Sequence, residues 1–441
     1  MTILHYSLGF PPYRTGGLTK FCTDLMKEQV NSGYRVALLW PGEIRWNIKN
    51  VEIRGHKPIN GIGNYELVNP LPIPYDEGIK DFKLYIQSEN GNAFENLLEE
   101  IKPDVIHIHS LMGLYREFVE SARRKNIKLV YTTHDYFPIC PKVTMFRNGK
   151  LCSSFESCED CGICNTTALN LSAIRVLQSP PYRMLKDCKI VEYYRKRHRT
   201  VFLNKYISEN TIPVGTKDDF FKLRAFYCSI LQQMDIIHFN SSLTKSIYEK
   251  VIKLPKSRII SITHADIKDC RRIKQFNYGS LRIRYLGQPS GAKGYYLLRD
   301  ALDELWRRKK DFQLDVHFTP LEVTPYMQCH GKYKTQELEK VFDDTDVLIC
   351  PSIWNETFGY TVLEALSFGV PVVISDTVGA KDILNEACGL VFKSNDKKAL
   401  IEALEKLNPQ KLSEMNSAIC QYQGIKTMRD MSDEILSTCY K

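Results

Sequence analysis

One local pattern occurs twice along the chain: a short apolar run, a loop rich in glycine, and an amphipathic segment with helical spacing. In the first half the apolar run is 3–8 and the helical segment is 18–31. In the second half these elements are 281–286 and 295–308, and further apolar runs alternate with helical segments. Strands that alternate with helices form a parallel sheet that helices cover on both faces. The pattern therefore predicts an α/β fold with two such units.

The boundaries of these units follow changes in the pattern. We expect an N-terminal Rossmann-like domain over 1–270, with a cysteine-rich and basic insertion at about 140–230. A charged stretch without periodicity, 266–280, is typical of a linker. A second Rossmann-like domain is expected over 280–415, and 416–441 is expected to be helical and to pack back on the first domain. The loops that follow the strands of both domains would then line one cleft, where ligands of this fold class bind.

Composition excludes several classes of protein. Hydrophobic residues make up 43% and charged residues 25% of the 441 residues, which is typical of folded domains. The net charge is only +9, and no recognition motif for nucleic acid occurs, so we expect no nucleic-acid partner. No apolar run approaches the ~18 residues of a membrane span, and the N-terminus lacks a signal sequence. We therefore expect a cytoplasmic protein whose 14 cysteines are mostly free thiols.

The strongest motif lies at 351–364, between an apolar strand and a helix. Glu356 lies in the loop of this motif and Glu364 lies inside the helix. Gly359 allows the backbone to approach a ligand closely, and first-turn amides such as that of Phe358 lack helical partners and can bind anions. An ionised carboxylate only accepts hydrogen bonds, which suits sugar hydroxyls. Two ordinary surface glutamates are the alternative interpretation.

A second glycine-rich loop, 285–294, also joins a strand to a helix. Its glycines, among them Gly287 and Gly291, allow the backbone to curl around a phosphate. Lys293 would add a positive charge where a diphosphate leaving group develops negative charge. The loop lacks the Gly-Lys-Ser/Thr of a Walker motif. A plain turn with a solvated lysine is the alternative.

Two weaker features lie in the first half of the chain. The pair Gly16-Gly17 precedes a helix, where two glycines most often mark a simple turn. His134 follows a strand in the run Thr133-His-Asp-Tyr136 and is expected at the same rim. There it could donate a hydrogen bond to a sugar hydroxyl or a phosphate. A structural histidine that is bonded within its own loop is the alternative.

Together these loops resemble the retaining glycosyltransferases of family 4, which have the GT-B fold. The Glu-x7-Glu motif of that family matches Glu356 and Glu364, and its Pro-Ser and Phe-Gly pairs match Pro351-Ser352 and Phe358-Gly359. Other matches are Gly369-Val370-Pro371, Gly379, Gly16-Gly17, Asp104 to His109 and His134 to Tyr136. The resemblance covers nearly the whole chain and is strongest between 281 and 392.

The resemblance implies two facing Rossmann-like domains, with the acceptor side in the first and the donor in the second. It implies that Glu356 and the Thr357-Phe358-Gly359 segment hold the donor sugar, and that Glu364 bonds the nucleotide ribose. The diphosphate would be held by Lys293 and the Gly16-Gly17 loop, and Gly287 and Gln288 would belong to the same donor-binding site. His134 would contact the sugar or phosphate near the reacting carbon, so that His134, Glu356 and Lys293 form the expected catalytic set.

Two positions depart from the family pattern. The family usually has an arginine immediately after the strand glycine, where this chain has Gln288. One charged contact to phosphate is therefore missing or is supplied from elsewhere. The usual Asn-Gly-Val-Asp before the linker is replaced by the run from Thr263 to Asp266.

The insertion contains a group of cysteines: Cys140, Cys152, Cys158, Cys161 and Cys164. Four thiolates can form a closed tetrahedral zinc site, so the spacing makes a structural zinc possible. An iron–sulfur cluster fits the spacing less well, because the fourth ligand is not placed as in ferredoxins. A third possibility is that the thiols bind no metal. The transfer reaction itself is expected to require no metal or other cofactor.

The insertion also carries a basic segment: Arg183, Lys186, Lys189, Arg195, Lys196, Arg197 and Arg199. A partial apolar stripe accompanies it: Met184, Leu185, Cys188 and Val191. Such a helix can lie on anionic lipid, which suits a lipid-linked acceptor and predicts peripheral binding to the inner face of a membrane. A solvated basic face is the alternative.

The expected function is transfer of a sugar, with retention, from a nucleoside diphosphate sugar to a hydroxyl of a glycan or lipid-linked acceptor. Surface polysaccharide or glycolipid biosynthesis is the expected setting. The motifs contain no obvious nucleophile, so positioning and leaving-group stabilisation should dominate. The alternatives are a nucleotide-sugar epimerase of the same fold, which needs no acceptor, and a non-catalytic sugar-binding or scaffold protein. A scaffold would need none of Glu356, Glu364 and Lys293.

Overall fold

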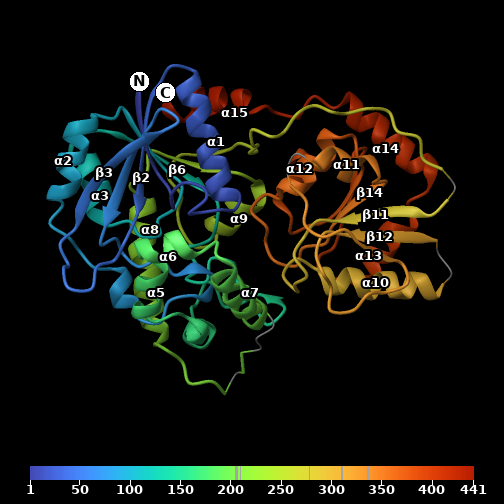
Figure 1. Cartoon of the computed structure of the whole chain (residues 1–441), viewed down its shortest axis with the longest axis horizontal. Coiled ribbons are helices and arrows are strands. Elements are labelled where there is room, and N and C mark those ends of the chain that lie inside the picture. The colour runs from blue at the N-terminus through green and yellow to red at the C-terminus, as the bar shows by residue number, and fades with distance from the viewer. Residues whose placement is uncertain (204–206, 209, 278, 309–310, 335–336) are drawn as a thin grey trace.

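The structure is a computed structural model. It describes residues 1–441 except 204–206, 209, 278, 309–310 and 335–336, and the side chains at 76, 196 and 198–203 also lie outside the described part. Figure 1 shows two lobes that lie side by side, with the last helix returning to the lobe that contains the N-terminus. Each lobe is built on its own parallel sheet.

The first lobe contains an eight-stranded sheet with the order β10-β9-β6-β5-β1-β2-β4-β3. Its strands are β1 (Thr2–Tyr6), β2 (Arg35–Pro41), β3 (Glu52–Ile59), β4 (Ile62–Val68), β5 (Val105–Ile108), β6 (Lys128–Thr133), β9 (Ile236–Phe239) and β10 (Ser257–Ile259). Neighbours are parallel except β3 and β4, which form an antiparallel edge hairpin. β5 and β9 are fully buried, as the continuous apolar runs of inner parallel strands require.

Helices cover both faces of this sheet. They are α1 (Gly17–Asn31), α2 (Asn92–Ile101), α3 (Arg116–Arg124), α8 (Lys217–Leu231) and α9 (Ser242–Glu249). Because side chains alternate along a strand, Leu4 and Tyr6 pack in the core that contains Phe118 of α3, whereas Ile3 packs in the core that contains Phe21 of α1. The two faces of β1 therefore belong to two separate cores.

The insertion between β6 and β9 is made of short elements around the base of the first lobe (Figure 1). They are β7 (Phe146–Arg147), β8 (Lys150–Leu151), α4 (Cys161–Cys164), α5 (Leu171–Gln178), α6 (Pro180–Leu185) and α7 (Lys189–Leu203). Gln178, at the end of α5, is buried and bonds to the domain. Its amide nitrogen donates to the carbonyl oxygen of Gly42 at 2.9 Å, and its amide oxygen accepts from the backbone N–H of Ile73 at 3.2 Å. The helices of the insertion thus pack on the domain.

The second lobe contains a fully parallel six-stranded sheet with the order β13-β12-β11-β14-β15-β16. Its strands are β11 (Leu281–Tyr285), β12 (Phe312–Val316), β13 (Met327–Cys329), β14 (Val347–Cys350), β15 (Val372–Ser375) and β16 (Gly389–Phe392). Its helices are α10 (Tyr295–Arg307), α11 (Leu338–Asp343), α12 (Tyr360–Ser367), α13 (Lys397–Glu405) and α14 (Pro409–Gln421). The predicted α/β fold with two facing Rossmann-like domains is confirmed.

The C-terminal segment joins the two lobes. α15 (Met428–Ile435) and a π-helical turn (Leu436–Tyr440) lie against α1 of the first lobe. Met431, Ile435 and Tyr440 are buried there, in a core that extends to α12 of the second lobe. None of the described helices combines the length and the apolar character that a membrane span requires.

Candidate functional site

Three helices begin at the cleft without a side-chain cap. α1, α10 and α12 start after Gly16, Gly294 and Gly359, and no side chain bonds to their first turns. Seven other described helices, α5, α6, α8, α9, α13, α14 and α15, are capped by Asn, Ser, Thr or Asp. α2, α3, α4 and α11 also lack a side-chain cap. The uncapped starts leave backbone N–H groups free for an anion.

The two loops of the second lobe meet because two glycines permit it. Gly294 has φ +70°, and a Cβ at this position would collide with the carbonyl oxygen of Pro351. Gly359 has φ +108°, a region that residues with side chains rarely adopt. In the described structure no hydrogen bond reaches the N–H of Phe358 or Gly359. The loop before α10 is therefore held directly against the loop before α12.

Lys293 and Glu356 form the polar centre of this meeting point. Lys293 Nζ donates to Glu356 Oε1 at 2.6 Å, and the side chains are 29% and 14% exposed. Ser352 Oγ donates to the other carboxylate oxygen at 2.6 Å. The ammonium group also lies 5.2 Å from the ring centroid of Trp354. The structure thus brings together the two residues that the sequence motifs placed on separate loops.

The first lobe contacts this centre through two of the predicted residues, His134 and Gly17. Thr357 Oγ1 donates to the carbonyl oxygen of His134 at 3.2 Å, and Ser241 Oγ donates to the carbonyl of Thr357 at 2.7 Å. A Cβ added to Gly17 would lie 3.2 Å from the ring of Tyr360, at the start of α12. Gly17 and His134 therefore lie directly against the donor-side loops of the second lobe.

Glu364 has a partner that the motif analysis missed. Its Oε1 lies 3.2 Å from Nε2 of buried His264, and the ring of Tyr360 lies edge-on to that histidine at 5.2 Å. His264 belongs to the run that replaces the usual Asn-Gly-Val-Asp of the family. That departure was the signal that could have identified His264 as a site residue.

Gln288 lies on the exposed side of the loop after β11. Its backbone carbonyl accepts from Tyr285 Oη at 2.7 Å, while its side chain makes no hydrogen bond within the described part of the chain. A Cβ on Gly287 would clash with the Tyr285 hydroxyl, so this glycine also serves packing. Glycines that the sequence suggested for phosphate binding thus also allow the loops to pack closely.

The cysteines of the insertion influence one another: Cys161 interacts with Cys158 and Cys140, and Cys140 interacts with Cys152 and Cys164. A hydrogen bond from the free thiol of Cys161 lowers the pKa of the Cys158 thiol. Burial, with the nearby Cys164 and Cys152, raises the pKa of Cys140 to about 12. Among the described residues, the group of three potential ligands with atoms within 4.8 Å is His5, His107 and His109, and these thiols form no such group.

The basic segment is not one solvated or lipid-facing stripe, which corrects the sequence interpretation in part. Arg183 donates to Glu66 at 2.8 Å and lies over the rings of Tyr13 and Trp40 at 4.8 and 4.9 Å. Buried Lys186 donates to the carbonyl of Pro12. These two basic residues fold inward because the first lobe provides a buried acidic partner and backbone acceptors; the side chains of Lys196 and Arg199 lie outside the described part.

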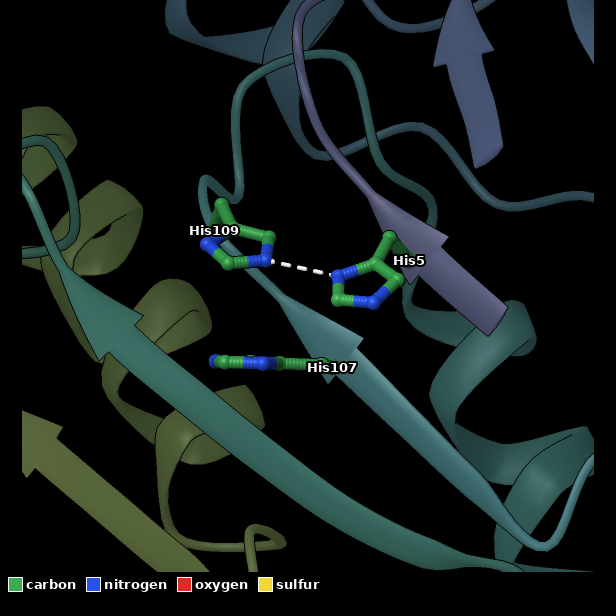
Figure 2. Close-up of side chains that lie close together, drawn as sticks. All are labelled: His5, His107 and His109. Carbon is green, nitrogen blue, oxygen red and sulfur yellow. Dashed lines mark hydrogen bonds between the residues drawn. The ribbon is translucent and has the colours of Figure 1, made fainter. Parts of the chain in front are cut away.

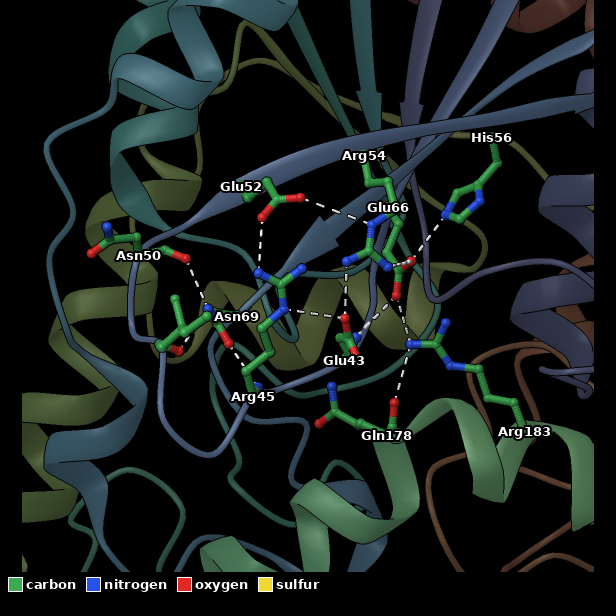
Figure 3. Close-up of polar contacts among 11 residues, drawn as sticks. Glu43, Arg45, Asn50, Glu52, Arg54, His56, Glu66, Asn69, Gln178 and Arg183 are labelled. Carbon is green, nitrogen blue, oxygen red and sulfur yellow. Dashed lines mark hydrogen bonds and ion pairs between the residues drawn. The ribbon is translucent and has the colours of Figure 1, made fainter.

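Figure 3 shows the polar network to which Arg183 belongs. Glu66 is almost fully buried and also contacts His56 at 2.9 Å and Arg54 at 3.4 Å. Burial alone would raise the pKa of Glu66, but the charge of Arg183 and the hydrogen bonds to the carboxylate hold it below its usual value. The network ties α6 to the edge strands of the first sheet.

Comparison with known sequences places these motifs in a family. The family model described as "Glycosyltransferase Family 4" matches 15–153, and the model "Glycosyl transferases group 1" matches 319–422. An uncharacterized 42.6 kDa protein in the cps region of Klebsiella pneumoniae is 24% identical over 390 residues, which cover 86% of each chain. A second such protein, of 41.2 kDa, is 26% identical over 145 residues, 32% of this chain and 40% of that one.

Comparison with solved structures shows the same fold. Sucrose-phosphate synthase from Thermosynechococcus elongatus aligns with a TM-score of 0.57 at 13% identity, over 99% of this chain and 97% of that one. Anabaena HepE in complex with UDP-glucose aligns with a TM-score of 0.54 at 12% identity, over 99% and 100%. WaaG, a glycosyltransferase involved in lipopolysaccharide biosynthesis, aligns with a TM-score of 0.51 at 14% identity, over 99% and 100%.

Asp135, next to His134, should make the stability of the folded protein depend on pH. Burial raises its pKa from 3.8 to about 6, although the N–H of Phe137 donates to it at 2.9 Å. The folded chain therefore binds this proton more tightly than the unfolded chain, and the stability that this contributes below about pH 4 is lost as the pH rises through 6. Asp135→Asn should stabilise the protein at pH 7.5 by on the order of 1–3 kcal/mol and have little effect at pH 4.

Thermal unfolding followed from pH 4 to 8 measures this difference. Asp433→Asn, at an exposed position on α15, is the control and should leave the profile unchanged. An Asp135→Asn gain of equal size at both ends of the range would show that Asp135 does not titrate as stated.

Proposed function

We propose, from the premise that the chain belongs to glycosyltransferase family 4 and has the GT-B fold, that it transfers a sugar from a nucleoside diphosphate sugar to an acceptor hydroxyl with retention at the anomeric carbon. Members of that family are glycosyltransferases, so this assignment is preferred over the two alternatives from the sequence, an epimerase and a non-catalytic scaffold. The donor, the stereochemistry and the biological setting are the proposed part.

The Lys293–Glu356 pair carries this proposal. A cation and an anion lie 2.6 Å apart at the start of two uncapped helices, opposite the Gly16-Gly17 start of a third. A diphosphate sugar has complementary chemistry, because its phosphates need positive charge and N–H donors while its hydroxyls need an acceptor. In the absence of a donor the two side chains neutralise each other.

The proposed reaction follows from these groups. As the bond between the anomeric carbon and the diphosphate breaks, the leaving oxygen gains negative charge. Lys293 and the free amides before α1 and α12 would stabilise that charge. The carboxylate of Glu356, which accepts from Lys293 and Ser352 in the absence of a donor, would accept from sugar hydroxyls and hold the sugar. Retention would then result from departure and attack on the same face of the sugar.

Two observations support a role in surface polysaccharide assembly. Relatives of this chain are encoded in a cps region, and the HepE structure with which it aligns contains UDP-glucose. UDP-sugars are accordingly the first donors to test. The acceptor would be a glycan or a lipid-linked sugar on the side of the first lobe.

A thermal-shift panel of UDP-, GDP- and ADP-sugars tests the donor site. One nucleotide class should raise the melting temperature, because a ligand that binds only the folded state stabilises it by mass action. Glu356→Gln and Lys293→Met should each abolish most of that shift. The matched controls are Lys398→Met and Glu402→Gln, an exposed pair on α13 that should keep the full shift. No shift with any donor, or equal shifts in all variants, would contradict the proposed donor site.

We also propose that the insertion binds an anionic membrane surface. Met184 is 85% and Ile190 70% exposed, and Leu185, Tyr193 and Tyr194 are exposed beside them. Among the described side chains of this region, Lys189, Arg195 and Arg197 are basic residues that remain on the surface. Exposed apolar side chains with basic neighbours are typical of interfacial helices. This arrangement would place the cleft near a lipid-linked acceptor.

Sedimentation with phosphatidylglycerol vesicles tests this proposal. The wild type should bind these vesicles at low salt and bind less at moderate salt. Met184→Asp combined with Ile190→Asp should weaken binding at least roughly tenfold, since both apolar contacts are lost. Leu321→Asp, at an equally exposed position in the second lobe, is the control and should leave binding intact. Equal binding by all three proteins, or none by the wild type, would reject the membrane role.

We further propose, from the spacing of the cysteines in the sequence, that a structural zinc is held by thiols of the insertion. Elemental analysis of the purified protein should then give about one zinc per chain. Cys158→Ser with Cys161→Ser should remove it, and exposed Cys329→Ser should not. Wild-type protein without stoichiometric zinc would refute the proposal.

A further inference from the structure

A continuous chain of hydrogen bonds runs through the core of the first lobe behind His134. His134 Nε2 lies 3.3 Å from His109 Nδ1, and His109 Nε2 lies 2.9 Å from His5 Nδ1. His5 Nε2 lies 2.8 Å from Gln29 Oε1, whose amide nitrogen lies 3.2 Å from the hydroxyl of Tyr440. These hydrogen bonds thus run from the loop after β6, through the loop after β5, β1 and α1, to Tyr440 of the π-helical turn.

The series of hydrogen bonds continues beyond Tyr440 and ends at a backbone carbonyl oxygen. The Tyr440 hydroxyl lies 2.7 Å from His107 Nδ1, and His107 Nε2 lies 2.6 Å from Thr132 Oγ1. Thr132 Oγ1 lies 2.9 Å from Nδ1 of His238, whose Nε2 lies 2.7 Å from the carbonyl oxygen of Ile260. A carbonyl oxygen can only accept, so His238 must carry its proton on Nε2.

Because His238 must donate to Ile260, the donor and the acceptor of every other hydrogen bond in the series can be assigned if the rings are neutral. Burial lowers the pKa of His5 and His238 to about 4 and that of His134 to about 3, and the pKa values of His107 and His109 also lie well below 6.5. Each neutral ring has one donor and one acceptor nitrogen. Working back from Ile260, Thr132 donates to His238, His107 donates to Thr132, and Tyr440 donates to His107.

The same direction continues through the amide to the cleft. Tyr440 accepts from the amide nitrogen of Gln29, whose oxygen accepts from Nε2 of His5. His5 then accepts from His109, and His109 accepts from Nε2 of His134. All five rings therefore carry their proton on Nε2. Reversing the Gln29 amide would reverse the remaining bonds and leave buried His238 with two protons and a positive charge, which burial opposes.

A metal ion is the competing use of this cluster. Figure 2 shows His5, His107 and His109 with ring nitrogens near one another, and their ligand atoms lie within 4.8 Å. Both nitrogens of His107, however, already have hydrogen-bond partners in Tyr440 and Thr132. Both nitrogens of His5 are likewise bonded. A cation bound by one nitrogen of each ring would have to break at least two of these bonds without gaining an anionic ligand.

We infer that Tyr440 and Gln29 are positioning residues that hold His134 in the Nε2–H tautomer, so that His134 presents Nδ1 to the cleft as a hydrogen-bond acceptor. Within the described part of the chain no hydrogen bond reaches that Nδ1. A sugar hydroxyl would therefore donate to His134, which reverses the donor role expected from the sequence. The contact with the sugar rests on the proposed function, whereas the tautomer does not.

NMR of donor-free protein with 15N-labelled histidine tests the tautomer directly. At pH 7 the long-range 1H–15N spectrum should show Nε2–H and unprotonated Nδ1 for His5, His107, His109, His134 and His238. Single His→Gln variants provide the assignments. A His134 ring that is protonated on Nδ1, doubly protonated or averaged between tautomers would overturn the inference. So would a shift of the His5, His107 and His109 signals on addition of one equivalent of Zn²⁺.

Tyr440→Phe tests the link to the tail. Loss of one hydroxyl removes the constraint on Gln29, so the His134 signals should move toward a mixture of tautomers, and kcat/KM with the donor found in the panel should fall about tenfold. Thr438→Val removes a hydroxyl from the same turn, which bonds only within the tail, and should change neither. An unchanged His134 spectrum in Tyr440→Phe would overturn the positioning role. A shifted spectrum without any donor binding would contradict only the proposed function.

Discussion

The ion pair between Lys293 and Glu356 is the interaction around which the cleft is organised. Its partners come from loops after two adjacent parallel strands, β11 and β14, and those loops touch because Gly294 has no side chain. Either charge alone, at this degree of burial, would be costly. Paired, and with Ser352 on the second oxygen, they keep the site assembled until a ligand of matching charge replaces each partner.

Closure of the cleft depends on contacts of a different kind. The lobes meet near the site through small polar contacts, such as Thr357 with His134 and Ser242 with Asp382 at 2.6 Å. Such contacts are weak enough to break when a donor enters or a product leaves. The apolar contact of α15 with α1 lies away from the cleft and keeps the lobes connected. The tail therefore stays docked, and through Tyr440 it also reaches the ring of His134.

Much of the fold could be predicted because inner parallel strands are continuous apolar runs. β14 and β15 are buried along their whole length and stand out in the sequence for that reason. β3 could not be predicted, since it is an exposed edge strand with glycine, proline and charged residues and shows no alternation. The glycine-rich loops could be predicted because backbones that come into close contact need glycine at those positions.

The rest of the site could not be predicted because it depends on contacts between distant residues. The partners in the histidine chain are up to 411 positions apart, and a lone histidine in a strand gives no sign of its partner. Arg183 was taken for part of a surface charge because its partner Glu66 lies 117 positions earlier. Only its burial in the folded structure reveals the pair.

The account rests most directly on the claim that Lys293 binds the diphosphate while Glu356 binds the sugar. Titration calorimetry of Glu356→Gln with the free nucleoside diphosphate and with the matching nucleotide sugar separates these roles. The variant should bind the free diphosphate at least as tightly as the wild type, because Lys293 has lost its competing partner. It should bind the nucleotide sugar about tenfold more weakly, because a charged hydrogen bond to the sugar is gone. Equal weakening of both ligands would contradict the division of roles on which the site is built.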